Sequence, residues 1–265
     1  MDNLNTHLVA VARAMVLSSD ELAHIKTSIS NLQSKLDSCF GNVLKKHFRF
    51  GSSTRDTILP RKVDDGSDID YMVVFNNQYQ YKPSTLLEKL RRFAIAYYGR
   101  SEIYQSSPTM VLELNHIKFE LVPAYQSDSR SDSYFIPAPS TDYASWTSTN
   151  PSEIQKKVNE ANNRNNSQIK RLIRLLKYWN VKNGKVYSSY ELENHIAGRI
   201  FWNCISLEDY FYDAVSGLPT YSLPQYKKDK VTRLQETVAK IKKGYYTNGY
   251  KYLAMEELKK LFPMP

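Results

Sequence analysis

Two carboxylates separated by one residue, Asp68 and Asp70, open an apolar run over residues 71–75. Because side chains of a β-strand alternate between its faces, a strand here would project both carboxylates from the same face. Two like charges at this spacing repel each other, and a cation between them relieves the repulsion. Mg²⁺ is usually held by one or two carboxylates together with substrate phosphates. The pair therefore predicts a magnesium site at the start of a strand.

A Gly-Ser pair precedes the two carboxylates in the chain. Gly51 and Ser52 predict a tight turn whose backbone N–H groups and hydroxyl can hold phosphate oxygens, and Arg55 follows as a further candidate contact. Each of these elements alone is common in turns and at strand ends, so the prediction rests on their combination. A cation site beside a phosphate-binding turn indicates a site for a nucleoside triphosphate.

The order of these parts resembles the DNA polymerase β-type nucleotidyltransferase superfamily. In that family a Gly-Ser pair and an Asp-x-Asp strand are followed by a third carboxylate on a later strand. Residues 118–124, Lys-Phe-Glu-Leu-Val-Pro-Ala, stand at that place, with Glu120 where the family more often has Asp. Glu113 is the alternative, and Asn115-His116 predicts the turn of a hairpin joining the two strands. We prefer Glu120 as the third metal ligand because the Leu-Val-Pro-Ala tail follows it.

The composition suits a ligand of negative charge. The chain has 265 residues and a formal net charge of +9, which favours a polyanion such as a nucleotide or RNA but equally fits a generally basic surface. Its two cysteines, Cys39 and Cys204, lie too far apart to indicate a disulfide framework or a zinc site. We find no signal peptide and no apolar stretch of about eighteen residues, so we expect a cytoplasmic protein without a membrane partner.

The pattern of expected elements indicates an α+β fold with two lobes. Residues 1–150 would form N-terminal helices and a catalytic lobe with a mixed β-sheet. Residues 151–265 would form a helical lobe, and the active site would lie in the cleft between the lobes. Strands are expected between about residues 102 and 136, whereas the pattern is almost wholly helical from Pro151 onward.

Three local signals predict where helices begin. Ser18 can cap the second helix of the N-terminal region. Ser84 is a candidate cap for a helix that ends near Tyr98, and Asn150-Pro151 would open a helix that ends near Asn162.

The helical lobe contains a second group of candidate phosphate contacts. Leu-Lys-Tyr-Trp at residues 176–179 and Ser-Tyr-Glu-Leu-Glu at residues 189–193 resemble two helices of the cyclic GMP-AMP synthase and oligoadenylate synthetase branch. The resemblance implies that Lys177 contacts the triphosphate as a point charge and that Ser189 donates a hydrogen bond to it. A solvated helix face and a helix cap are the structural alternatives for these two residues. Tyr190 is a candidate for stacking a base.

The segments at residues 136–139 and 146–151 look like the connection between the lobes in bacterial relatives of cyclic GMP-AMP synthase. The resemblance to these cyclic-oligonucleotide synthases covers residues 19–210. It implies nucleotidyl transfer by two Mg²⁺ ions, with Mn²⁺ as a substitute, held by Asp68, Asp70 and Glu120. The substrates would be ribonucleoside triphosphates and the product a cyclic or linear oligonucleotide second messenger. The implied partners are an effector protein in anti-phage signalling and, as in animal relatives, an activating RNA.

Two other functions are compatible with the sequence. An enzyme with the same site could transfer a nucleotide to an external acceptor, such as an RNA 3′ end, an antibiotic or a toxin protein. A basic binding module with a remnant Asp pair is disfavoured, because an inactive site has no reason to keep two mutually repelling carboxylates. The bases joined, the linkage and the ring size are not specified by these motifs.

Overall fold

The structure, a computed structural model, describes residues 3–77, 80–106, 108–126, 132–139, 144–246 and 249–264. The chain divides into two compact units. The sheet unit comprises Leu17–Arg61 and Asp65–Gln155, and the helical unit comprises Met1–Val16, Lys62–Asp64 and Lys156–Pro265. Within the described residues, none of the helices combines the length and the apolar character needed to cross a membrane.

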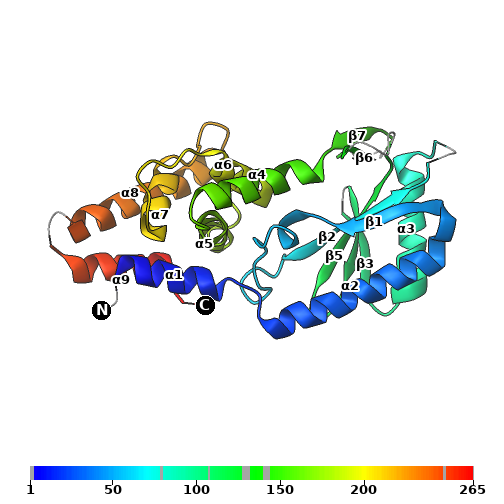
Figure 1. Ribbon diagram of the computed structural model, residues 1–265, viewed down its shortest axis with the longest axis horizontal. Helices are drawn as coiled ribbons and strands as arrows, with labels where there is room; N and C mark the ends of the chain where they lie inside the picture. Colours follow the sequence, from blue (N-terminus) through cyan, green and yellow to red (C-terminus); the bar gives the residue numbers. More distant parts are fainter. Residues whose placement is uncertain are drawn as a thin grey trace. The chain divides into compact units, whose positions relative to one another are not determined.

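The sheet unit is built on a five-stranded sheet with the order β1-β2-β5-β4-β3 (Figure 1). The strands are β1 (Leu44–Arg49), β2 (Asp68–Phe75), β3 (Glu102–Ser106), β4 (Thr109–Glu113) and β5 (Lys118–Ala124). Strands β2 and β5 run parallel, and the other neighbours are antiparallel, which confirms the predicted mixed sheet. A separate two-stranded ribbon pairs β6 (Tyr134–Pro137) with β7 (Trp146–Thr149).

The two faces of β2 have different environments. Its odd-numbered residues, among them Ile69 and Tyr71, join a large apolar cluster with α2 (Ser19–Phe40) and α3 (Pro83–Tyr98). Its even-numbered apolar residues, Met72 and Val74, belong to a smaller cluster on the other face. Asp68 and Asp70 share this second face because side chains alternate along a strand. The two helices therefore pack on the face of the strand opposite to the carboxylates.

The local signals for turns and helix starts are mostly confirmed. Ser18 caps α2 in a reciprocal capping box with Glu21. The turn between β4 and β5 closes with a hydrogen bond from Leu114 N to Ile117 O of 2.8 Å. The prediction that Ser84 caps the next helix was wrong, because α3 begins at Pro83, whose fixed φ suits the first helical position.

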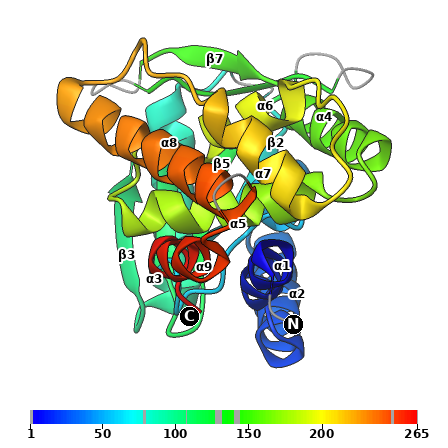
Figure 2. The same ribbon diagram turned by 90° about the vertical axis from the view of Figure 1, so that its left-hand side faces the viewer.

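The helical unit gathers helices from both ends of the chain (Figure 2). They are α1 (Leu4–Ala14), α5 (Ile169–Lys182), α6 (Ser189–Gly198), α7 (Leu207–Ser216), α8 (Gln225–Tyr246) and α9 (Lys251–Leu261). Helix α4 (Pro151–Arg164) begins at the predicted Asn150-Pro151 signal, and the boundary between the units falls within it.

Helix α1 belongs to the helical unit, although the division at residue 150 would place it with the sheet. Leu4, Leu8 and Val11 are fully buried, and the helix contacts α5, α7 and α9. The His7 ring hydrogen-bonds through Nε2 to the Phe262 carbonyl at 2.8 Å. Figures 1 and 2 both show α1 beside α9.

Candidate functional site

The parallel pairing of β2 with β5 brings the predicted acidic residues together. Asp70 stands opposite Glu120 in the register, and Asp68 stands opposite Lys118. Because paired residues of adjacent strands project from the same face, all four side chains share the face that α2 and α3 leave uncovered. This arrangement places Glu120 directly beside the Asp pair.

A lysine that the sequence reasoning did not single out lies among these carboxylates. Lys118 Nζ is 3.2 Å from Glu120 Oε1 and 3.5 Å from Asp68 Oδ2. The signal that could have revealed it is its position two residues before Glu120, which puts both on one face of a strand. The ammonium partly neutralises a cluster of negative charge.

The electrostatics of the cluster show a deficit of positive charge. Burial and, to a lesser extent, the negative charge of Glu120 outweigh the opposing effect of Lys118 and raise the pKa of Asp68 to about 6. Burial alone would lower the pKa of Lys118, but the charges of Asp68 and Glu120 outweigh it and leave that pKa raised. The carboxylates therefore attract a further cation.

The Gly-Ser turn lies against the same carboxylates. Phe50 N donates a 3.0 Å hydrogen bond to Asp70 O, and the chain then enters the 3₁₀ turn η2 (Gly51–Ser53). Gly51 is buried and has a φ of +75°, and a Cβ at this position would overlap the Asp70 carboxylate. Both the conformation and the space therefore require glycine.

The loop after the turn is tied into the sheet unit. Thr54 Oγ1 donates to Gln155 Oε1 at 2.9 Å, and Gln155 Nε2 donates to Thr54 O at 3.1 Å. Ser52 is half-buried, and its carbonyl accepts the Thr57 N–H at 3.1 Å. Arg55, predicted as a nucleotide contact, is only 5% exposed, so the structure does not present it as an open contact.

Glu113, the alternative third acid, has a different partner. Its Oε1 accepts a 2.6 Å ion-pair contact from Arg61 Nη2. It lies on β4, one strand further from β2 than Glu120. The geometry therefore groups Glu120, and not Glu113, with the Asp pair.

The donor set suits a hard divalent cation. Three carboxylates supply oxygen ligands, the kind that Mg²⁺ prefers, and the Lys118 ammonium already acts as a stand-in cation on two of them. In the part of the chain that the structure describes, however, no three His, Cys, Asp or Glu side chains converge as a ready-made metal group. Asp68, Asp70 and Glu120 would hold the ion after local rearrangement.

Lys177, predicted to contact phosphate, lies in a buried ion pair of the helical unit. Its side chain on α5 is 5% exposed, and Nζ lies 3.2 Å from Oε1 of Glu193, a fully buried residue on α6. The pair joins two helices that follow one another in the chain. The ammonium is therefore paired with Glu193 and largely withdrawn from solvent.

The start of α6 separates the roles of two neighbouring serines. Ser188 is the helix cap, in a capping box with Glu191, so the Ser189 hydroxyl is not used for capping. Tyr190 is 59% exposed and lines a cavity of about 260 Å³ together with residues of the loop after α7. Both predicted residues thus present polar groups at the surface of the helical unit.

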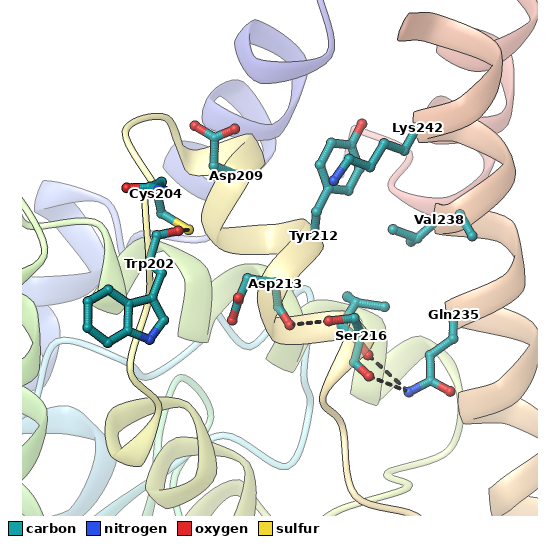
Figure 3. Close-up of a pocket in the computed structure, with 12 residues that line it drawn as sticks. Trp202, Cys204, Asp209, Tyr212, Asp213, Ser216, Gln235, Val238 and Lys242 are labelled. Carbon is teal, nitrogen blue, oxygen red and sulfur yellow. Dashed lines mark hydrogen bonds between the residues drawn. The ribbon is translucent and has the colours of Figure 1, made fainter. Parts of the chain in front are cut away.

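A second cavity in the helical unit, of about 390 Å³, contains none of the predicted site residues (Figure 3). Trp202, which is 77% exposed, comes from the loop before α7, and Lys242 comes from α8. Gln235 Nε2 donates to the carbonyls of Val215 and Ser216 at 3.1 and 3.4 Å, which holds one wall together.

Comparison with known proteins identifies a family. A profile described as "Second Messenger Oligonucleotide or Dinucleotide Synthetase domain" matches residues 3–162. A protein of Bacillus cereus (strain VD146) named a probable cyclic nucleotide synthase is 26% identical over 203 residues. These residues are 62% of this chain and span 60% of the length of that protein.

Solved structures share the fold at low sequence identity. The Vibrio cholerae cyclic AMP-GMP synthase DncV gives a TM-score of 0.73 at 12% identity, over 94% of this chain and 92% of that one. CdnG of Bradyrhizobium diazoefficiens, solved with GTP, gives 0.71 at 12% identity over 98% of both chains. CdnC of E. coli MS115-1, solved with ATP, gives 0.70 at 15% identity over 96% of both.

We expect Gly51→Ala to destabilise the protein more than Gly249→Ala. Both glycines have a φ near +70°, but a Cβ at Gly249 meets nothing within 4 Å. Gly249→Ala should therefore cost only the positive-φ backbone conformation, about 1–2 kcal/mol, whereas Gly51→Ala must also displace Asp70. Urea denaturation measures the free energy of unfolding of both variants. Equal decreases would show that the Asp70 carboxylate does not exclude a Cβ at position 51.

We expect the contribution of Asp68 to the stability of the metal-free protein to fall as pH rises from about 4 to about 6. The pKa of Asp68 is raised from 3.8 to about 6, so in this window the folded state binds more protons than the unfolded chain. Stability decreases with pH wherever that holds. Urea denaturation in EDTA at several pH values measures the stability of wild type and of Asp68→Asn. If the two proteins show the same dependence of stability on pH, the pKa of Asp68 is not raised.

We expect Lys177→Ala to lower the free energy of unfolding by about 3–5 kcal/mol, because it leaves the buried Glu193 carboxylate without its ammonium. The double variant Lys177→Met/Glu193→Leu should recover most of this loss. Arg171→Ala, at an exposed position of the same helix, is the control and should change stability by less than about 0.5 kcal/mol. Urea denaturation gives all three values; a small loss for Lys177→Ala would mean that the pair is not a structural contact.

Proposed function

The chain belongs to the family of Second Messenger Oligonucleotide or Dinucleotide Synthetase domains, and on this premise we propose that it is a metal-dependent nucleotidyltransferase. It joins ribonucleoside triphosphates into a cyclic or linear oligonucleotide second messenger. The observation that carries the proposal is the register of β2 and β5, which places Asp68, Asp70 and Glu120 on one face. The family match confirms the resemblance to cyclic-oligonucleotide synthases that the sequence motifs indicated.

The residues of the sheet unit have two roles in the proposed nucleotidyl transfer, phosphate binding and metal binding. Gly51 and Ser52 hold the phosphates of the donor nucleotide beside Asp70, as the close approach of Gly51 to that carboxylate supports. Asp68, Asp70 and Glu120 would hold the metal ions on the shared face of β2 and β5. Two bound Mg²⁺ or Mn²⁺ ions would lower the pKa of that hydroxyl and neutralise the leaving pyrophosphate.

The residues of the helical unit have supporting roles in this proposal. Ser189, which capping leaves available, donates its hydroxyl to the triphosphate, and the exposed Tyr190 ring stacks on a base. Lys177 fixes α6 through Glu193, so that it orients Ser189 instead of contacting phosphate directly. Structurally similar proteins support nucleotides as the substrate class, since CdnG was solved with GTP and CdnC with ATP.

The product acts as a signal inside the bacterial cytoplasm. An effector protein that recognises it is the downstream partner, and anti-phage defence is the process that the family resemblance favours. The net charge of +9 is compatible with an activating RNA.

The test is incubation of the purified protein with the four ribonucleoside triphosphates and Mg²⁺ or Mn²⁺, with and without RNA. Phosphatase treatment followed by mass spectrometry reveals a product without terminal phosphates, and its mass gives the bases and the ring size. Asp70→Asn and Glu120→Gln should each lower the yield by at least about 100-fold, because each removes a charge from the metal site.

Glu113→Gln is the matched control for the third acid and should keep most of the activity, because Glu113 pairs with Arg61. Nucleotide that is consumed without a phosphatase-resistant product would favour transfer to an external acceptor. A chain that binds no triphosphate under these conditions would contradict the proposed enzyme.

A further inference from the structure

Lys118 provides a positive charge at the place where the carboxylates need one. Its side chain is 15% exposed, and its ammonium bridges Glu120 and Asp68, which belong to adjacent parallel strands. The bridge engages one oxygen of each carboxylate. A metal ion held by the same two residues would need oxygens of this pair.

We propose that Lys118 is an internal counter-ion of the carboxylate site. In the metal-free protein it holds Asp68 and Glu120 in place, and it leaves them when a divalent cation binds. This inference rests on the proposed function only in taking these carboxylates as metal ligands. It makes Lys118 a positioning residue that sets how much free Mg²⁺ the enzyme requires.

Charge and geometry both support displacement. A lysine ammonium and a divalent cation repel each other, so the two cannot share the same oxygens at contact distance. Mg²⁺ also requires near-octahedral ligand geometry at short distances, and the carboxylates are now arranged around the ammonium. This explains why, among the described residues, the acids do not converge as a ready-made metal group.

The lysine side chain is suited to such an exchange. Its charge is a compact ammonium at the end of a flexible four-carbon chain, so it can withdraw without a movement of the strand. The backbone of Lys118 remains paired opposite Asp68 in the sheet. The exchange therefore changes side-chain positions while the register that aligns the acids is kept.

The test measures binding of Mn²⁺ to the full chain without nucleotide, by calorimetry and by electron paramagnetic resonance. Lys118→Met should bind Mn²⁺ at least about fivefold more tightly than wild type, because the ion no longer displaces a bound cation. Lys45→Met, at an exposed position of β1, is the matched control and should bind as wild type does. Asp70→Asn should lose the binding, which shows that the signal belongs to this site.

Thermal denaturation gives a second readout of the same exchange. In EDTA, Lys118→Met should melt below wild type, because Asp68 and Glu120 lose their counter-ion. Addition of Mg²⁺ should raise its melting temperature by more than that of wild type. If Lys118→Met does not fold, Lys118→Arg should keep the wild-type Mn²⁺ affinity within about twofold while Lys118→Gln binds more tightly.

If the uncharged variants bind Mn²⁺ no more tightly than wild type while Asp70→Asn loses the binding, the counter-ion role of Lys118 is overturned. The metal site of the proposed function is then unaffected. Unchanged Mn²⁺ binding by Asp70→Asn would overturn both this role and the metal site of the proposed function. Absence of an oligonucleotide product would not affect the metal measurement, so the two failures are distinguishable.

Discussion

The register between β2 and β5 is the constraint on which the chemistry of this protein depends. A shift by one residue would turn every side chain of β2 to the opposite face and separate Asp70 from Glu120. The apolar residues that β2 packs against α2 and α3 oppose such a shift, since it would bring charges into the core. The stability of the core is therefore what holds the acidic residues in position.

Holding like charges together has an energetic cost, and the structure shows what offsets it. The raised pKa of Asp68 reflects burial and the nearby Glu120. The Lys118 ammonium supplies positive charge 3.2 Å from Glu120 Oε1, and the missing side chain of Gly51 leaves room for the Asp70 carboxylate. Glycine adopts the positive φ of this turn without steric cost.

The sequence predicts what local chemistry determines. Spacing and residue type predict the Asp pair on a strand, the hairpin before Glu120 and the cap at Ser18. They also predicted a cap at Ser84, but the helix begins one residue earlier, at Pro83. Contacts between distant segments were not predictable in this way. The bridge of Lys118 to Asp68 depends on the pairing of two strands fifty residues apart, and the burial of Lys177 depends on how two helices pack.

Helix α1 links the first residues of the chain to the last ones. Its partners α5, α7 and α9 all lie beyond residue 168, and the His7 ring contacts the Phe262 carbonyl. All residues of the sheet unit have been synthesised once residue 155 has left the ribosome, so we expect this unit to fold first. Helix α1 can contact α5 only after residue 182 has been made and α9 only after residue 261, and contacts between segments so far apart in the chain form slowly. On this order of events, the nascent chain brings Asp68, Asp70 and Glu120 together before its helical unit is assembled.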